Sequence, residues 1–325
     1  MFAAVQDTVL QLLPSKRRRS PSGWISFNAV CCHHRGQSQD SRGRGGIMIA
    51  TDGLVNYHCF NCNFKASYRP GRHLGYKFRR LLSWLGANDN DIQRLVIEAV
   101  RIKDLVVVTD ELTESEEIVF KPRSLPDDVR LVDEDAVALK YCQERHINLT
   151  KYPLLVSNRT DHNLNRRVII PFTWKGTLIG YTSRAWDPLV RPKYYSNYEP
   201  NYVFNIDGQG PQSKFVIVTE GVFDAMSIDG IAVLSNNCNE TQADIIDSLA
   251  REVIVVADRD RAGRQLITNA IEYGWSVSFP EWLETCKDVN DAVCKYGTLF
   301  VLKTILNSKE TGRLKIELKS KRLYS

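Results

Sequence analysis

The chain has 325 residues, of which 43% are hydrophobic and 25% are charged, so it can bury more than one core. No apolar run approaches the eighteen or so residues that a membrane span needs, which excludes an integral membrane protein built from apolar helices. The net charge of +5 hides an imbalance: residues 1–80 carry 13 Lys and Arg against 3 acids, and the other 245 carry 30 against 35. The basic first part indicates binding to nucleic acid.

The first residues predict an amphipathic helix and not a secretory signal. Apolar side chains recur there at helical spacing and end at Pro14: Val5, Val9, Leu12 and Leu13. The basic cluster at 16–19 follows the apolar part, whereas in a signal peptide it would precede it. We therefore expect a cytoplasmic protein whose eight cysteines are reduced or bound to metal.

Two short segments have the spacing of a structural zinc site. Residues 31–34 have the sequence CCHH, and residues 59–62 have the sequence CFNC. Two ligands placed two residues apart reach adjacent corners of a tetrahedron, so the segments predict one Zn²⁺ in a ribbon-type site. The predicted ligands are Cys31, His34, Cys59 and Cys62. Cys32 in place of Cys31, or His33 in place of His34, is an alternative that the spacing leaves open.

The segment between these knuckles predicts a small sheet that binds a single strand of nucleic acid. A basic, Gly-rich stretch at 40–46 precedes two apolar strands, at 47–50 and 54–60. Arg42 and Arg44 are expected on its loops beside aromatic rings, and this combination suits stacked bases and phosphates. The aromatic residues are Trp24, Phe27, Tyr57 and Phe60. Packing in the core of the ribbon is the alternative for them, and it is favoured for Phe60.

The middle of the chain predicts a connector followed by a strand-rich segment. Helical spacing, short apolar runs and prolines alternate up to residue 150: helices at 78–86, 88–102 and 133–147, strands at 106–108 and 116–120, and a Pro-interrupted stretch at 121–129. Strands are then predicted at 165–174 and 175–186, joined by a hairpin turn at WKGT, and within 192–205.

Three carboxylates follow apolar runs that are typical of buried parallel strands. Glu220 ends FVIVTE, and Asp258 and Asp260 follow VIVVA. The carboxyl ends of parallel strands are where open α/β sheets bind their ligands, and converging carboxylates favour a divalent cation such as Mg²⁺ between them. Asp224 lies one helical turn beyond Glu220. Capping and turn formation are the alternative for the D-x-D pair. Two glycines stand where the backbone must turn sharply beside these acids: Gly221 and Gly263.

The ordered motifs TEGVFDAM, VIVVADRDRAGRQL and KDVNDAV resemble the TOPRIM domain, over roughly residues 213 to 297. This resemblance implies that Glu220, Asp258 and Asp260 hold one or two Mg²⁺ at a site that acts on nucleic-acid phosphates. Asp224 and Asp288 would orient waters or a second ion. The third motif departs from the form found in primases, because Asn290 stands where a second aspartate is usual.

The order of zinc knuckles, basic strands and TOPRIM motifs resembles DnaG-type primases, most closely the shorter ones that large tailed phages encode separately from their helicase. The strand-rich segment carries the corresponding patterns R-x-x-x-P-F, I-G-x-x-x-R and P-K-Y-x-x-N. The resemblance implies that Arg167, Arg184 and Lys193 meet nucleoside triphosphates and template. No Walker motif is present, which argues against a fused helicase.

These patterns together predict an α/β (α+β overall) protein in five parts. The expected parts are a zinc-ribbon DNA-binding domain at 1–75, a helical and irregular connector at 76–150, a basic primase subdomain at 151–212, a TOPRIM catalytic domain with a mostly parallel sheet at 213–300, and a basic tail at 301–325. The predicted function is synthesis of RNA primers on single-stranded DNA during replication. Expected partners are ribonucleoside triphosphates, a replicative helicase and single-strand binding protein, with no membrane.

Two other functions compete with this one. A TOPRIM nuclease would cut DNA with no ribonucleotides present. A recombination mediator combines a zinc motif with a TOPRIM fold, needs no catalysis, and lacks the P-K-Y segment that stands at 192–194 here.

Overall fold

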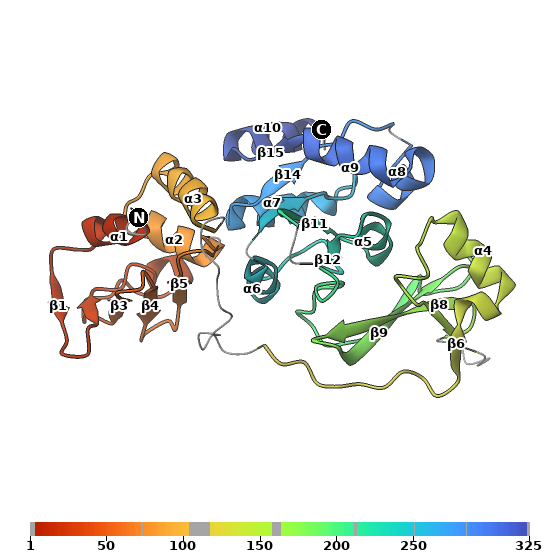
Figure 1. Ribbon diagram of the computed structural model, residues 1–325, viewed down its shortest axis with the longest axis horizontal. Coiled ribbons are helices and arrows are strands. Elements are labelled where there is room, and N and C mark those ends of the chain that lie inside the picture. Colours follow the sequence, from red (N-terminus) through yellow and green to blue (C-terminus); the bar gives the residue numbers. More distant parts are fainter. Residues whose placement is uncertain are drawn as a thin grey trace. The chain divides into compact units, whose positions relative to one another are not determined.

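The structure is a computed structural model that describes residues 4–72, 74–103, 118–157, 164–210, 213–249, 251–283 and 285–323. The chain forms two compact units (Figure 1). The first comprises Met1–Ser115 with Asp247–Ala250, and the second comprises Glu116–Ile246 with Arg251–Ser325. None of the described helices combines the length and the apolar character that crossing a lipid bilayer requires.

The first unit contains a five-stranded antiparallel sheet whose strands follow one another in chain order. Its strands are β1 (Arg17–Arg19), β2 (Ile25–Phe27), β3 (Gly45–Ile49), β4 (Val55–Cys59) and β5 (Lys65–Tyr68). Burial alternates along β4, where Val55, Tyr57 and Cys59 are buried and the residues between them are half-exposed. This period of two is the pattern that predicted the strand.

Helices cover one face of this sheet and complete its core. They are α1 (Ala4–Leu12), α2 (Tyr76–Trp84) and α3 (Asp89–Lys103), whereas the short helix η1 (His33–Arg35) has no buried residue. The amphipathic helix predicted at the start of the chain is α1, which buries Val5 and Val9. Leu81 of α2 and Leu95 of α3 belong to the same hydrophobic core as the strands. The helices predicted as part of a connector therefore pack with the ribbon.

The second unit begins with another antiparallel sheet, in the order β10-β9-β8-β7-β6. Its elements are β6 (Val129–Leu131), η2 (Val132–Glu134), α4 (Ala136–Glu144), β7 (Leu155–Ser157), β8 (Arg167–Trp174), β9 (Thr177–Ala185) and β10 (Tyr194–Asn197). The β8–β9 turn has positive φ at Lys175 and Gly176, as a two-residue hairpin turn of type I′ requires, so the predicted hairpin is confirmed. The strand predicted at 106–108 lies outside the described residues, and Ile118–Phe120 form no strand.

The second sheet of this unit is mostly parallel, as predicted. The order is β12-β11-β13-β14-β15, and only β15 runs antiparallel to its neighbour. The strands are β11 (Phe215–Thr219), β12 (Ile231–Ala232), β13 (Glu252–Val255), β14 (Ser276–Ser278) and β15 (Lys309–Glu310). The helices are α5 (Val222–Ile228), α6 (Glu240–Ser248), α7 (Gly263–Tyr273), α8 (Val289–Tyr296), α9 (Thr298–Asn307) and α10 (Arg313–Leu323). The mixed α/β class is confirmed.

The end of the chain is built into this sheet. Val301 and Ile305 of α9 lie in one hydrophobic core with Ile217 of β11 and Ile254 of β13, and β15 pairs with β14. Helix α9 thus spans the boundary predicted at residue 300. The other predicted domain boundaries stay predictions.

Candidate functional site

Glu220 and Asp258 lie at the same edge of the parallel sheet. Strands β11 and β13 are in register, with Val218 opposite Val255, so the chain leaves both strands side by side. The backbone N–H of Asp258 donates a hydrogen bond to Glu220 Oε1 at 3.1 Å. The two acids that the sequence separates by 38 positions are thereby in direct contact.

Asp260 accepts backbone hydrogen bonds at the start of α7. Its Oδ1 accepts hydrogen bonds from the N–H groups of Ala262 (2.8 Å) and Gly263 (3.0 Å), and its side chain is exposed. This is the capping and turn geometry that the sequence left open as an alternative. In the part of the chain that the structure describes, no hydrogen bond reaches Asp260 Oδ2, so that oxygen remains available to a ligand.

Two glycines let the backbone approach these carboxylates. A Cβ at Gly263 would lie 2.2 Å from the carbonyl oxygen of Asp258 and 3.0 Å from Glu220 Oε1, and a Cβ at Gly221 would lie 2.7 Å from Asp224 Oδ2. Neither glycine adopts the left-handed backbone conformation. Close packing of the backbone against the acids therefore favours glycine at both positions.

Asp224 and Asp288 form a second, more deeply buried pair. Asp224, in the first turn of α5, is 6% exposed and its Oδ1 accepts a hydrogen bond from the N–H of Asn290 at 2.8 Å. Asp288 caps α8 by accepting from the N–H of Asp291 at 2.7 Å. Burial raises the pKa of Asp224, and the charge of Asp288 adds to that shift.

Burial and mutual repulsion raise the pKa of these acids. Burial raises the pKa of Glu220 from 4.5 to about 7; the hydrogen bond from Asp258 opposes this shift and the charge of Asp260 adds to it. The pKa of Asp258 is raised by burial and then by the charges of all four other acids: Asp224, Glu220, Asp288 and Asp260. We refer to these five residues as the carboxylate site. Asp258 is the member on which the charges of all the others act.

The carboxylate site fits Mg²⁺ in one respect and differs from the prediction in another. Among the described residues, no three carboxylates have oxygens all within 4.8 Å of one another, so Glu220, Asp258 and Asp260 do not form one ready inner coordination sphere. Mg²⁺ commonly takes one or two carboxylates, several waters and substrate phosphates. The contacting pair Glu220 and Asp258, with the open oxygen of Asp260 nearby, suits that mode of binding.

Basic side chains from the antiparallel sheet face the carboxylate site. Lys193 is an exposed residue, but partial burial of its amine lowers its pKa, as do the charges of Arg184 and Arg145. The charges of Asp288 and Asp258 oppose this shift. The guanidinium of Arg184 lies over the rings of Tyr194 (4.7 Å) and Phe223 (5.7 Å). The contact with Phe223 places Arg184 against α5, and the charges of Asp288 and Asp258 act on Lys193.

Arg167 does not take the predicted place. Its side chain has no exposed area, and its guanidinium donates hydrogen bonds to the carbonyl oxygens of Pro192 and Lys193. Direct contact with a nucleotide is therefore excluded in this conformation, and the expectation is corrected. Arg167 instead fixes the backbone beside Lys193, because β8 places this residue on the face of the sheet that is covered.

Arg145 was missed by sequence reasoning. It follows α4, and its guanidinium lies over the rings of Tyr141 (5.2 Å) and Phe223 (5.4 Å). Its Nη1 donates to Asn290 Oδ1 at 2.7 Å, and the charge of Asp288 also acts on it. The sequence placed it only near the end of the helix predicted at 133–147, and no local pattern marks it as part of a distant site.

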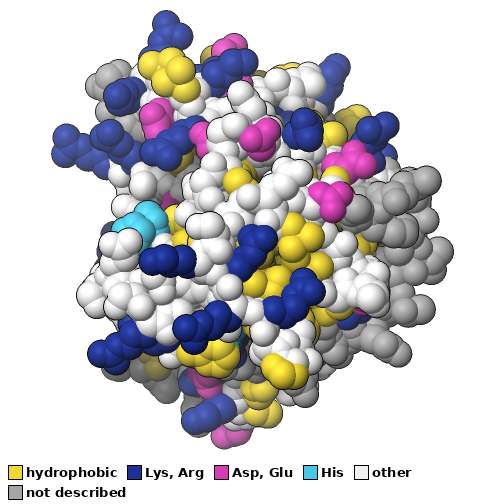
Figure 2. All heavy atoms as spheres, turned by 90° about the vertical axis from the view of Figure 1, so that its left-hand side faces the viewer, with side chains coloured by type: hydrophobic (Ala, Val, Ile, Leu, Met, Phe, Trp, Pro, Cys, Tyr) yellow, Lys and Arg dark blue, Asp and Glu magenta, His cyan; other side chains and the backbone are white. Residues whose placement is uncertain are grey.

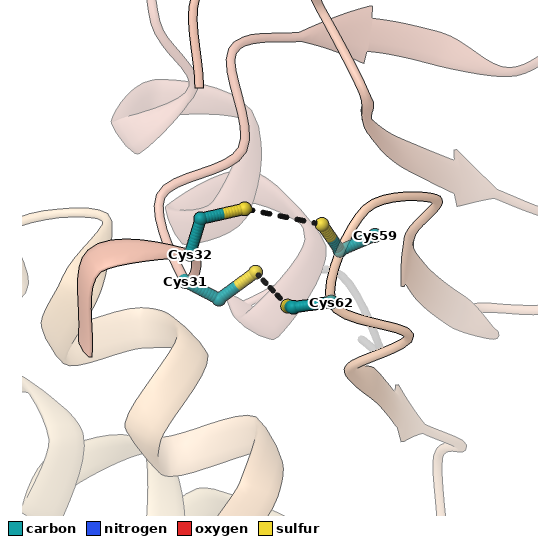
Figure 3. Close-up of side chains that lie close together, drawn as sticks. All are labelled: Cys31, Cys32, Cys59 and Cys62. Atoms are coloured by element: carbon teal, nitrogen blue, oxygen red, sulfur yellow. Dashed lines mark hydrogen bonds between the residues drawn. The ribbon is translucent and has the colours of Figure 1, made fainter. Parts of the chain in front are cut away.

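Four cysteines converge in the first unit (Figure 3). The Sγ atoms of Cys31 and Cys62 are 3.4 Å apart, and those of Cys32 and Cys59 are 3.6 Å apart. All four sulfurs lie within 4.8 Å of one another, and none of the four is in a disulfide. Four thiolates bound to one Zn²⁺ at about 2.3 Å stand roughly 3.8 Å apart, so this spacing fits a tetrahedral ion.

Cys32 takes the place that was predicted for His34. The short helix η1 begins directly after Cys32 and turns both imidazoles to the surface, where His34 stacks on Trp84 at 5.0 Å. The predicted ligand set is corrected accordingly, to Cys31, Cys32, Cys59 and Cys62. Tyr57 Oη lies 3.3 Å from Cys31 Sγ and Asn61 donates to Cys32 Sγ, polar contacts that suit thiolates.

The open face of the first sheet carries aromatic and basic side chains. Trp24 and Phe60 both lie over Gly46, where an added Cβ would meet their rings at 3.1 and 3.7 Å. Phe60 is 69% exposed, which corrects its expected place in the core, whereas Phe27 and Tyr57 are buried. The register aligns four residues across the sheet beside these rings: Arg18, Ser26, His58 and Lys65. Figure 2 shows Lys and Arg side chains spread over the face of the molecule that lies on the left in Figure 1.

The two arginines predicted on the loop have different roles. Arg42 is exposed, and its backbone N–H donates to Asp40. Arg44 pairs with Asp40 at 2.9 Å and also contacts Asn61. Burial opposes ionisation of Asp40, but hydrogen bonds from Ala29, Arg42 and Arg44 hold its pKa well below the usual range. Arg44 therefore stabilises the loop, and Arg42 stays accessible to a ligand.

Residues 217–293 match the family described as Toprim-like, and this segment contains all five carboxylates of the site. No curated protein matches the chain. Among solved structures, the chain is similar to a DnaG catalytic core (TM-score 0.45, 16% identity, 53% of this chain and 73% of that one) and to the DnaG primase catalytic domain bound to ssDNA (0.47, 16%, 57% and 75%). It is also similar to the zinc-binding and RNA polymerase domains of the Aquifex aeolicus primase (0.44, 16%, 98% and 88%).

Proposed function

We propose that the protein is a DNA primase of the DnaG type, which synthesises short RNA primers on single-stranded DNA. The observation that carries the proposal is the carboxylate site: Asp258 and the four acids around it, within a Toprim-like segment and faced by Arg184 and Lys193. Acids that can hold Mg²⁺ beside fixed cations are the arrangement that nucleotidyl transfer from a triphosphate requires.

Glu220, Asp258 and Asp260 would hold Mg²⁺, which when bound neutralises the triphosphate and activates the 3′-hydroxyl for in-line attack on the α-phosphorus. Arg184 and Lys193 would bind the phosphates, the arginine through its fork of N–H donors and the lysine as a point charge. Asp224 and Asp288 would orient waters or a second ion.

The first unit would bind the template. Cys31, Cys32, Cys59 and Cys62 would hold a structural Zn²⁺ that leaves no open coordination position. Bases of a single strand would stack on Trp24 and Phe60, and Arg18, Arg42 and Lys65 would contact phosphates. A replicative helicase and single-strand binding protein would be the partners at a replication fork.

The proposal is tested by incubating the protein with single-stranded DNA, labelled ribonucleotides and Mg²⁺ and sizing the products. Wild-type protein should make short RNA, and Asp258→Ala should abolish incorporation while single-stranded DNA still binds. Synthesis that survives Asp258→Ala would reject the assignment. Cleavage of DNA in the absence of ribonucleotides would indicate the nuclease, and DNA binding with no reaction would indicate the mediator.

A further inference from the structure

Asn290 joins three helices at the back of the carboxylate site. Its side chain is 1% exposed. Its Oδ1 accepts from Arg145 Nη1 at 2.7 Å, and its Nδ2 donates to Arg145 O at 2.8 Å and to Ser227 Oγ at 2.6 Å. Its backbone N–H donates to Asp224. The residue thus connects the end of α4, the helix α5 and the start of α8 through one amide group.

These bonds determine which way the amide points. The two hydrogens of Nδ2 are both used, because Arg145 O is an acceptor that cannot donate. Oδ1 must then face the guanidinium of Arg145. An aspartate here would lose both donated hydrogen bonds and would place a negative charge against Arg145, next to Asp224.

Arg145 is the side chain whose position this amide sets. Its guanidinium packs over the faces of the Tyr141 and Phe223 rings. One of its N–H groups donates a hydrogen bond to the amide oxygen of Asn290. A guanidinium has five N–H donors, and a hydrogen bond to a neutral amide occupies one of them without adding a negative charge. Lys193 and Asp288 both act on Arg145 electrostatically, which places it at the carboxylate site.

We propose that Asn290 is a positioning residue: its neutral amide fixes Arg145 beside the carboxylates and leaves the charge of Arg145 free for a phosphate of the incoming nucleotide. The inference rests on the proposed function, because it assigns a nucleoside triphosphate to the site. It also gives a physical reason for an amide at a position where the resembling primases have a carboxylate.

The test compares Asn290→Asp with Asn269→Asp, a matched control. Asn269 is another buried asparagine of the second unit, 6% exposed, whose Oδ1 accepts from Cys238 N away from the site. Asn290→Asp should raise the KM for nucleotide roughly tenfold, as expected for one charge-assisted contact, and should change kcat by less than about twofold. Asn269→Asp should lower Tm and leave KM unchanged.

Arg145→Gln keeps Asn290 and removes the charge, so it tests the inference even if the buried variant does not fold. It should raise KM to a similar extent, and adding Asn290→Asp to Arg145→Gln should have little further effect on KM. An unchanged KM in Arg145→Gln would overturn the inference. A lower Tm with an unchanged KM in Asn290→Asp would also overturn it.

Nucleotide binding separates this inference from the proposed function. Fluorescent ATP with Mg²⁺ and no template reports affinity directly. Wild-type protein that binds ATP but makes no RNA would remove the primase proposal, and weaker binding by Asn290→Asp would still support the inference. Equal ATP affinity of wild type, Asn290→Asp and Arg145→Gln would refute it.

Discussion

Single residues determine how closely the backbone can approach the carboxylates. Gly263 has no side chain because Asp258 O and Glu220 Oε1 occupy the space where a Cβ would be. At the other end of the chain, one position decides the metal ligands: Cys32 faces the other three thiols and His34 faces Trp84. Both features depend on contacts between individual atoms, which the spacing of sequence motifs does not predict.

Gly263→Ala should disrupt the site from its backbone side. The new Cβ would require Asp258 and Glu220 to move apart, at a cost of about 1–3 kcal/mol for overpacking. We expect a lower Tm and at least a roughly tenfold loss of ribonucleotide incorporation. Gly312→Ala is the matched control, because nothing lies within 4 Å of its Cβ position. Full activity of Gly263→Ala would show that the acids tolerate displacement.

Zinc content distinguishes the two possible ligand sets. Cys32→Ser should reduce bound zinc from about one ion per chain to almost none, because an alcohol is a poor substitute for a thiolate ligand. His34→Ala should keep the ion, because its ring stacks on Trp84 and takes no part in the cluster. Zinc is measured by elemental analysis of purified protein. Loss of zinc in His34→Ala with zinc retained in Cys32→Ser would restore the set that spacing suggested.

At the scale of elements, the site is assembled where strands β11 and β13 and helices α5, α7 and α8 end or begin. Four of the acids accept a hydrogen bond from a backbone N–H of another segment or of their own turn, as Asp224 does from Asn290 and Glu220 does from Asp258. The elements hold the carboxylates against their mutual repulsion. The pKa values of Glu220 and Asp258 rise because burial disfavours the charged form and neighbouring acids add to that cost.

Stability should therefore depend on pH in a defined direction. A carboxyl with a higher pKa in the folded than in the unfolded protein binds more protons when folded, so the free energy of unfolding falls as pH rises between the two values. For Glu220 this interval runs from 4.5 to about 7, and the raised pKa of Asp258 extends it upward. In magnesium-free buffer we expect a lower Tm at pH 8.5 than at pH 6.

Added Mg²⁺ and a variant test whether the carboxylate site causes this dependence of stability on pH. Because Mg²⁺ binds the deprotonated carboxylates, millimolar Mg²⁺ should raise Tm more at pH 8.5 than at pH 6. Asp258→Asn should flatten the slope, and Asp133→Asn, which changes an exposed acid outside the site, should not. Tm is followed by circular dichroism. A slope that Asp258→Asn leaves unaltered would locate the effect elsewhere in the protein.

At the scale of the whole molecule, charge and chemistry are divided between the two units. Residues 1–80 hold a surplus of ten positive charges, and the remaining residues a deficit of five. The first unit presents exposed Phe60 and the arginines of β1, and the second unit contains the carboxylate site. Binding of a strand and reaction with a nucleotide should then be separable by mutation.

Phe60→Ala should weaken binding of single-stranded DNA by the full chain, because loss of one stacking ring costs about 1–3 kcal/mol. Arg18→Ala should lower the slope of log affinity against log salt by about 0.7 if it contacts one phosphate. Phe300→Ala is the control, because this ring is 49% exposed on α9 of the second unit. Fluorescence anisotropy at several salt concentrations measures all three. Equal losses in Phe60→Ala and Phe300→Ala would refute a specific platform.

Sequence by itself determined the features that repeat locally or follow from strand direction. The period of two predicted β4, the period of a helix predicted α1, and acids after apolar runs predicted that Glu220 and Asp258 meet at one sheet edge. Parallel strands bring their carboxyl ends together whatever lies between them, so that conclusion needed no tertiary contact.

Only the tertiary structure decided which side chains face a site and which are covered. It buried Arg167, exposed Phe60, chose Cys32 over His34 and brought Arg145 to Asn290 across 145 positions. Orientation of this kind depends on how elements far apart in the chain pack against each other. Residue type and spacing describe only nearby positions in the chain, so they do not show which distant residue a side chain will contact in the fold.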